Sequence, residues 1–206
     1  MTDIRKICVF CGSSPGHDPR YIHQARTLGR VLAENDLTLV FGASNIGLMG
    51  ALAAAVMENS GYAIGVIPKR IYQMVSHRPL SEEHVVEDMH ERKALMYNLA
   101  DAFLVMPGGL GTMEEFFEAF TWNQLGYHLK PIGILEVNEF FAPLLAFLKH
   151  MAAEGFCRQE QLDTLAVEQD PACLIKRLQE QKLKPISKHD HGRGLPDKNQ
   201  EPGEGR

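Results

Sequence analysis

The chain has 206 residues, of which 45% are hydrophobic and 23% charged, and its formal net charge is −5. This is the composition of an ordinary globular protein, and its acidic balance argues against a protein whose main task is to hold nucleic acid. No apolar stretch approaches the roughly 20 residues that a membrane span requires. The N-terminus does not read as a secretory signal. Four cysteines in a chain of this length do not indicate a disulfide framework, so we expect a reducing, cytoplasmic location.

Short apolar runs alternate with amphipathic segments along the chain. The runs that we expect to be strands are residues 4–11, 37–41, 62–67, 101–106 and 131–137, with weaker candidates at 84–87 and 164–167. The segments that we expect to be helices are residues 19–35, 51–58, 89–100, 112–127, 139–154 and 171–182, whereas 69–83 is expected to be irregular. This alternation predicts βαβ units, and therefore an α/β fold with a mainly parallel sheet and helices on both faces.

The end of the chain differs in composition from the rest. In residues 187–206 the only aliphatic side chain is Leu195, among glycines, prolines and charges. Such a segment does not form a core, so we expect a single domain over residues 1–186 and a disordered polar tail after it. His189 and His191 are capable of binding a stray metal ion, but a solvated tail is the favoured interpretation.

The strongest candidate site follows the run at 101–106, in the motif Pro107-Gly108-Gly109-Leu110-Gly111-Thr112-Met113-Glu114-Glu115. Ligands of open α/β sheets bind beyond the carboxyl ends of the strands. The glycines let the backbone turn sharply and approach a ligand closely, and free N–H groups at a helix start favour a phosphate. An alternative for Thr112 and Glu115 is a capping box, in which Thr112 caps the helix and Glu115 bonds back to it.

Two other loops also follow strand-like runs. Residues 42–50 (GASNIGLMG) contain Gly42 and Gly47 and match neither a Walker loop nor the dinucleotide fingerprint. For this loop, contact with a nucleotide and tight packing of a helix on the sheet are equally favoured. Residues 11–16 (CGSSPG) include Ser14, whose hydroxyl is a weaker candidate for reaching a phosphate or a sugar.

Cys8 and Cys11 have the spacing of a redox or zinc pair. Cys8, however, lies within an apolar strand-like run, and the sequence has no second CxxC to complete a zinc site. Buried structural thiols are therefore the favoured interpretation, and we expect no metal site.

Arg92 is a candidate functional residue near the start of the helix expected at 89–100. It shares a helical face with the apolar residues Leu95 and Met96, and a cation in the first turn opposes the helix dipole. A residue that violates two local preferences is a candidate for function; an internal salt bridge, for example with Glu115, is the competing explanation. Lys93 falls on a different face, where an ordinary surface charge is the alternative.

The helix expected at 112–127 is apolar on nearly every side. Its large apolar residues are Phe116, Phe117, Phe120, Trp122 and Leu125. A helix of this kind is buried against more than its own sheet. We therefore favour a two-fold subunit interface, and burial within a monomer is the alternative.

Taken together, these motifs resemble those of the Lonely Guy (LOG) family of cytokinin riboside 5′-monophosphate phosphoribohydrolases. PGGLGTMEE fits the pattern P-G-G-x-G-T-x-x-E, MHERK precedes it, and CGSS, GLMG and TWNQLG extend the similarity over about residues 4–183. The resemblance implies a Rossmann-like three-layer α/β sandwich that forms a homodimer or a larger assembly. It also implies hydrolysis of the N-glycosidic bond of adenosine 5′-monophosphate, plain or N6-substituted, to free base and ribose 5-phosphate, with no cofactor. Nothing marks a pyridoxal-phosphate lysine, so the lysine decarboxylase label of some members is not adopted.

The resemblance further assigns roles to single residues. Arg92 and Glu115 match the catalytic pair, and Lys93 matches the residue beside the arginine. The residues expected to bind substrate are Lys93, Gly108, Gly109, Leu110, Gly111, Thr112, Met113 and Glu114, then Thr121 of the following helix, and Ser14, Gly42 and Gly47 of the other two loops. The chain departs from the family where Gly42-Ala43-Ser44 replaces three glycines and in segment 69–88. Both departures bear on base preference more than on reaction type.

The chemistry of these side chains suits this reaction. Glycosidic cleavage passes through an oxocarbenium-like state, so the hypothesis for Glu115 is that its carboxylate stabilises that charge and orients or deprotonates water. Arg92 is then expected to hold Glu115 and the sugar, or to offset charge on the leaving base. One rival is a non-catalytic nucleotide or cofactor carrier, like the related molybdenum cofactor carriers. A single-stranded-DNA-binding protein is a weaker rival, because the chain has no Lys/Arg clusters.

Overall fold

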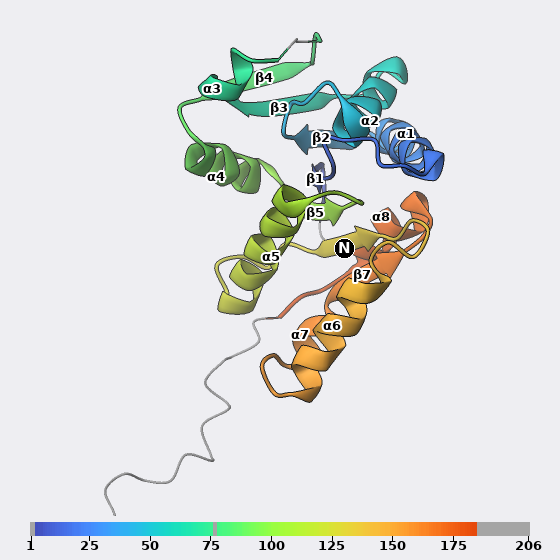
Figure 1. Cartoon of the computed structure of the whole chain (residues 1–206), viewed down its shortest axis with the longest axis vertical. Coiled ribbons are helices and arrows are strands. Elements are labelled where there is room, and N and C mark those ends of the chain that lie inside the picture. The colour runs from blue at the N-terminus through green and yellow to red at the C-terminus, as the bar shows by residue number, and fades with distance from the viewer. Residues whose placement is uncertain (1–2, 76–77, 185–206) are drawn as a thin grey trace, which may run out of the picture.

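The computed structural model describes residues 3–75 and 78–184. Within them the chain forms one seven-stranded sheet of order β4-β3-β2-β1-β5-β6-β7, in which neighbouring strands are parallel (Figure 1). The strands are β1 (Lys6–Phe10), β2 (Thr38–Phe41), β3 (Ala63–Pro68), β4 (Glu82–Val86), β5 (Ala102–Val105), β6 (Ile132–Leu135) and β7 (Leu165–Glu168). The predicted α/β fold is confirmed. The expected tail, with its two histidines, lies outside the described residues.

Helices cover both faces of this sheet. They are α1 (Pro19–Glu34), α2 (Gly47–Glu58), α3 (Lys69–Tyr72), α4 (Met89–Leu99), α5 (Leu110–Leu125), α6 (Ala142–Ala153), α7 (Gln159–Asp163) and α8 (Pro171–Glu180). On one face α1, α2 and α8 contribute to a core that includes Leu52 and Leu174. On the other face α4, α5 and α6 contribute to a core that includes Phe116 and Leu148. In Figure 1, α4 and α5 lie on the opposite side of β1 and β5 from α1 and α2.

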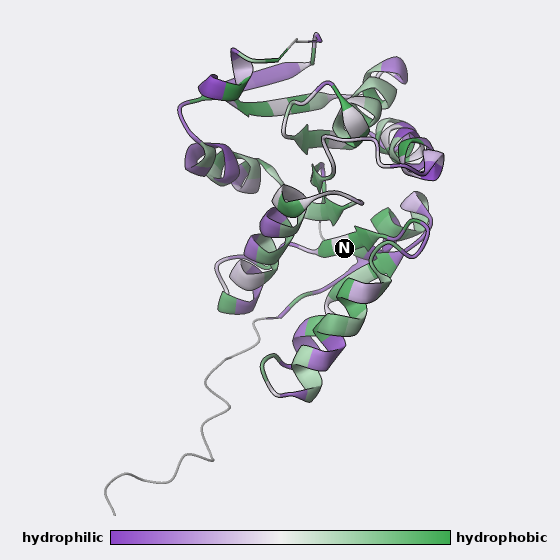
Figure 2. Ribbon diagram, viewed as in Figure 1, coloured by the Kyte–Doolittle hydropathy of each residue, from purple (hydrophilic) through white to green (hydrophobic). Residues whose placement is uncertain are grey.

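The central strands are apolar on both sides because both sides are covered. In β1, Ile7 and Val9 enter the first core, whereas Cys8 and Phe10 enter the second. Figure 2 shows hydrophobic central strands and a hydrophilic edge strand β4, whose charged residues protect an open sheet edge from pairing with another chain. Cys8 and Cys11 are buried free thiols, as predicted. No helix in the described part of the chain has both the length and the apolar character needed to cross a membrane.

The order of the strands determines where a ligand crevice forms. The chain runs outward from β1 through β2 and β3 to β4, and then returns to place β5 on the other side of β1. The strand order therefore reverses between β1 and β5, and open α/β sheets bind ligands beyond the carboxyl ends of the strands at such a point. The two loops that leave this point are joined, because the Gly12 N–H donates to the Pro107 carbonyl at 3.0 Å.

Several element boundaries differ from the predicted ones. α2 begins at Gly47 rather than at residue 51, and α5 begins at Leu110 rather than at 112. In both cases glycines that favour a loop by propensity lie inside the first turn of a helix. The segment at 69–83 contains the short helix α3 and the start of β4, and α7 was not predicted. Helices of one turn are too short to leave a periodic pattern.

Candidate active site

The centre of the site is an ion pair between Arg92 of α4 and Glu115 of α5. Arg92 Nη1 donates to Glu115 Oε1 at 2.7 Å, and the two side chains are only 12% and 11% exposed. Arg92 Nε also donates to the carbonyl of Val66, at 3.2 Å, near the end of β3. Asp88 caps α4 by accepting from two N–H groups of the first turn, which fixes the start of the helix that carries Arg92. The salt bridge considered for Arg92 is therefore present, within the predicted catalytic pair.

Burial changes the proton affinity of Glu115. Desolvation raises the pKa of the Glu115 carboxyl, and Arg92 opposes that effect while the neighbouring Glu114 adds to it. Burial also raises the pKa of the Cys8 thiol, and the charge of Glu115 raises it further. A buried carboxylate of raised pKa is suited to exchanging a proton with a reacting group.

Gly42 joins this pair from the end of β2. A Cβ at Gly42 would clash with Nη2 of Arg92, so the absence of a side chain makes room for the guanidinium. Ala43 follows in the left-handed region, with φ 56°, where a glycine would be unstrained. Its methyl group packs close to Gly65 of β3. The Gly42-Ala43-Ser44 departure therefore keeps the glycine that touches Arg92.

The helix that carries Glu115 starts on the predicted glycine motif. Gly109 is the N-cap of α5 and provides no side-chain cap, so the capping box proposed for Thr112 and Glu115 is wrong. Thr112 lies inside the first turn and is buried, with its hydroxyl beneath Gly108, where a Cβ would clash with it. Thr112 therefore supports the loop from below. The first-turn N–H groups, including those of Leu110 and Gly111, have no acceptor within a helix and are suited to an anion.

A cavity lies where the loops after β1 and β5 meet. Its volume is about 220 Å³, and residues from both loops line it, among them Ser13, Ser14, Gly108 and Gly109. Tyr21 of α1 also lines it. The fold thus brings Ser14 to the glycine motif, as the sequence predicts, at the point where the strand order reverses.

The first turn of α2 is already engaged by the chain itself. The N–H groups of Leu48 and Met49 both donate to the Gly12 carbonyl, at 3.0 and 3.2 Å. Gly47 has φ +62°, and a Cβ there would clash with the backbone of Ser13. Of the two interpretations considered for this loop, close packing is the one that these contacts support.

Lys93 is not the ordinary surface charge that its helical face allows. Its ammonium donates to Glu114 at 2.5 Å and to Glu118 at 3.0 Å, and its side chain is 12% exposed. Burial alone would lower the pKa of Lys93, but its hydrogen bonds to the two carboxylates outweigh burial and raise that pKa. Sequence reasoning missed Glu118 and Tyr97, whose hydroxyl donates to Glu118 at 2.7 Å. The spacing of Glu114 and Glu118, which places them on one helical face, was the available signal.

Thr121 and Met113 do not reach the ion pair within this chain. Thr121 is exposed on α5, six residues beyond Glu115, which corresponds to about 9 Å along a helix axis. Met113 packs against the second core. Leu110 is almost fully exposed at the start of α5. These positions leave the predicted role of Thr121 without support from this chain's own contacts.

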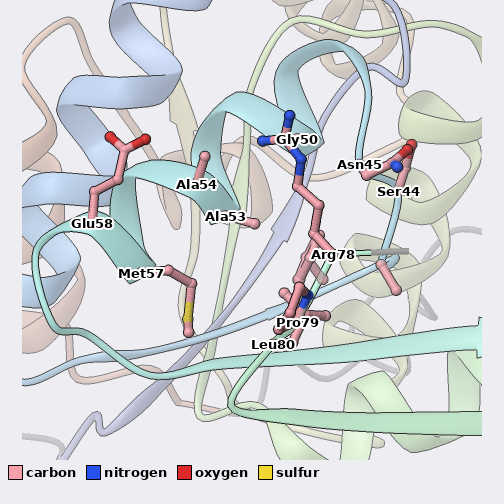
Figure 3. A pocket seen from close by; sticks show the side chains of 12 residues that line it. Ser44, Asn45, Gly50, Ala53, Ala54, Met57, Glu58, Arg78, Pro79 and Leu80 are labelled. Carbon is pink, nitrogen blue, oxygen red and sulfur yellow. The ribbon is translucent and has the colours of Figure 1, made fainter. Parts of the chain in front are cut away.

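A second cavity lies on the α2 face of the sheet, and neither this cavity nor the one at Ser14 is lined by Arg92 or Glu115. Its volume is about 250 Å³, and it extends between α2 and the segment that precedes β4. Figure 3 shows Met57 of α2 pointing into it and Arg78 extending toward Gly50. Ser44 lines this second cavity, so the departure at Ser44 changes the shape of this space.

Comparisons with known proteins identify relatives of this chain. Residues 49–178 match a family model described as "possible lysine decarboxylase". The cytokinin riboside 5′-monophosphate phosphoribohydrolase of Rhodococcoides fascians is 47% identical over 154 residues, which are 74% of this chain and 78% of that protein. The cytokinin riboside 5′-monophosphate phosphoribohydrolase LOG of Oryza sativa subsp. japonica is 45% identical over 157 residues, 76% of this chain and 65% of that protein.

The solved structures that are similar confirm the fold. The molybdenum cofactor binding protein of Rippkaea orientalis aligns with a TM-score of 0.63 at 21% identity, covering 85% of this chain and 96% of that one. Identity at this level speaks only for the shared architecture, whereas the matches above extend over the helices that carry Arg92 and Glu115. The chain belongs to the LOG family of cytokinin riboside 5′-monophosphate phosphoribohydrolases.

Proposed function

We propose that this chain hydrolyses the N-glycosidic bond of adenosine 5′-monophosphate, plain or N6-substituted, to the free base and ribose 5-phosphate. The observation that carries the proposal is the buried ion pair between Arg92 of α4 and Glu115 of α5, because α5 also begins at Gly109 with no side-chain cap on its first turn. Glu115 lies five residues after Leu110, about 7 Å along the helix axis. A ribose 5-phosphate whose phosphate contacts the first turn can place its anomeric carbon near Glu115.

The reaction follows from the positions of these groups. The first-turn N–H groups of α5 and the loop around Gly108 bind the phosphate, which anchors the substrate far from the bond that breaks. As the bond from C1′ to the base nitrogen breaks, its electron pair leaves with the base and positive charge develops on the ribose. The Glu115 carboxylate stabilises that charge, and it accepts a proton from the water whose oxygen bonds to C1′. The departing base nitrogen takes up one proton, so the products are the neutral base and ribose 5-phosphate. Arg92 holds the carboxylate in place through its hydrogen bond.

The other two interpretations have less support. A carrier would need the cavity at Ser14 and the glycine motif, but it would not need Glu115, a buried carboxylate of raised pKa that Arg92 holds by a hydrogen bond. Lysine decarboxylation through a Schiff base would need a lysine that readily becomes a neutral amine. Lys93 is bound by Glu114 and Glu118, which raise its pKa and favour the charged form.

Product analysis tests the proposal. The purified chain is incubated with the 5′-monophosphates of adenosine, N6-isopentenyladenosine, guanosine and cytidine, and free base and ribose 5-phosphate are quantified together. We expect equal amounts of both products from the adenine nucleotides. Tight nucleotide binding without release of either product would favour the carrier instead. Release of carbon dioxide from lysine would favour the decarboxylase description.

The proposal includes a homodimer formed through α5. Phe117 and Leu125 are exposed large apolar side chains, while Phe116 and Phe120 are buried within the chain's own core. Positions 117, 121 and 125 are four residues apart and therefore share one face of the helix. Thr121 would then meet the substrate only across this interface. All four cysteines, which lie in the described part of the chain, are free thiols, which supports a cytoplasmic site of action.

A further inference from the structure

The geometry of the Arg92–Glu115 pair depends on how α4 is held against α5, because each helix carries one partner. Besides that pair, one side chain of α5 contacts two side chains of α4. Glu118 accepts a hydrogen bond from the Lys93 ammonium on Oε1 at 3.0 Å and one from the Tyr97 hydroxyl on Oε2 at 2.7 Å. Glu118 therefore uses both carboxylate oxygens to join the two helices.

Tyr97 is a rigid support for this contact. The residue is buried, and its ring packs at centroid distances of 6.1 Å from Phe10, 5.3 Å from Phe103 and 5.0 Å from Trp122. Edge-on contacts of this kind restrict the ring. The hydroxyl also lies 3.2 Å from the backbone carbonyl of Glu115. Tyr97 thus holds the backbone of Glu115 in a fixed position relative to the aromatic side chains of the core.

Lys93 completes the contact between the helices. Its ammonium lies between Glu118 and Glu114, and Glu114 precedes Glu115 in the chain. The charged or titratable groups that act on Glu115 are Arg92 and Lys93 of α4 and Glu114 of α5. Glu115 in turn acts on Cys8 of β1 and on Cys11, which follows β1. Lys93 is the member of this group that Glu118 holds directly.

We propose that Glu118 and Tyr97 are positioning residues for the hydrolysis, which keep Arg92 and Glu115 in their hydrogen-bonded geometry and keep Lys93 beside them. This inference rests on the proposed function. Neither residue touches the substrate. Both act through α4 and α5, Tyr97 by its bond to Glu118 and by its contact with the backbone of Glu115, and Glu118 by holding Lys93.

A purely structural role would give different results from a positioning role. If the contact only joins the two helices, removing it lowers the thermal stability and leaves the turnover of the folded protein unchanged. If the contact positions the catalytic pair, removing it lowers kcat with little change in KM and shifts the pH dependence of kcat. Lys93 lowers the pKa of Glu115, so releasing Lys93 raises that pKa, and the loss of activity on acidification then occurs at a higher pH.

Tyr97→Phe is the main test, because it removes one hydroxyl and changes no charge. We expect kcat with adenosine 5′-monophosphate to fall about three- to tenfold, the effect of losing a hydrogen bond of ordinary strength. KM should stay within about twofold, because the phosphate loop is untouched. The acid limb of kcat should move to higher pH. Glu118→Gln, the second variant, should show the same split between kcat and KM.

Asn123→Ala is the matched control for stability. Asn123 is buried in α5, donates to the Lys130 carbonyl at 3.2 Å and accepts from Gln161 at 3.4 Å, and neither of these hydrogen bonds involves the side chain of Glu118, Tyr97 or Lys93. The Asn123→Ala substitution should lower Tm and leave kcat and the pH profile unchanged. The inference would be overturned if Tyr97→Phe and Glu118→Gln both kept the wild-type kcat and the wild-type acid limb of the pH profile. It would also be overturned if Asn123→Ala showed the same losses as these two variants. In both cases the proposed function would stand. A wild-type protein without turnover would overturn both.

Discussion

At the residue scale, the Arg92–Glu115 pair is an unusual feature for a chain to retain. Two charged side chains with about one tenth of their surface exposed have lost most of their hydration, and replacing such a pair by apolar residues is often neutral or stabilising. Removing only one partner typically costs about 3–5 kcal/mol, because the other charge stays buried and uncompensated. Stability is therefore a weak reason for this pair to be present, and a chemical role explains it better.

The raised pKa of Glu115 predicts the acid side of the pH profile. Burial disfavours the carboxylate, and the proposed role needs the ionised form. Activity is therefore present above the raised pKa and is lost as the pH falls through it. We expect the midpoint of the acid limb of the kcat–pH profile to lie above the ordinary glutamate pKa of about 4.3. Initial rates from pH 4 to 8, corrected for enzyme stability, measure it. A rate that stays flat down to the ordinary glutamate range would contradict the assignment.

Gly42→Ala should separate activity from stability. The added methyl group meets Nη2 of Arg92, the far end of a side chain, so the guanidinium moves while the backbone keeps its conformation. We expect kcat to fall at least about tenfold, since misplacing a catalytic group by a fraction of an ångström is costly. The free energy of unfolding, measured by thermal denaturation, should change by about 1 kcal/mol or less. Wild-type turnover in this variant would show that the position of Arg92 does not matter.

At the element scale, the start of α5 is the part of the structure that we propose binds the phosphate. The Gly109 cap leaves the first-turn N–H groups without a side-chain acceptor, and the helix dipole adds to their attraction for an anion. Adenosine, which lacks the phosphate, should therefore show kcat/KM lower than its 5′-monophosphate by about a hundredfold or more. Parallel assays of the two compounds measure the ratio. Equal values would remove α5 from substrate binding.

The sequence predicts elements better than it predicts their ends. Apolar runs such as residues 101–106 show which strands are buried, because parallel strands with helices on both faces must be apolar throughout. The start of α5 was placed two residues late, since Gly111 disfavours a helix and Thr112 resembles a cap. The fold overrides this local preference by burying Thr112 beneath Gly108.

The same limit applies to the site. Arg92 was identifiable because a cation on an apolar face and in the first turn of a helix violates two local preferences. Glu115 was identified through the family resemblance, because its position alone was equally compatible with a capping box. The spacing of Glu114 and Glu118 places them on one helical face, but it does not identify them as the partners of Lys93, because helical periodicity says nothing about contacts between helices. Tyr97 looked like an ordinary core residue for the same reason, and its ring is indeed part of the core.

At the scale of the whole molecule, the exposed face of α5 predicts the oligomeric state. Phe117 and Leu125 are separated by two turns on one side of the helix, and apolar surface of this kind marks an interface. We expect the protein to be a dimer by light scattering at micromolar concentration, and Phe117→Glu with Leu125→Glu to be a folded monomer of lower activity. A wild-type monomer that is fully active would contradict this arrangement.

The measurement that tests the central claim most directly is single-turnover hydrolysis of adenosine 5′-monophosphate by wild type and by Glu115→Gln, with nucleotide affinity measured in parallel. Glutamine keeps an acceptor for Arg92 but neither carries the negative charge nor accepts the proton of water. The account predicts a rate at least about a hundredfold lower, with an affinity within a few-fold of wild type and with the fold intact by circular dichroism. A variant that binds the nucleotide and still cleaves it at the wild-type rate would show that Glu115 is not the catalytic carboxylate.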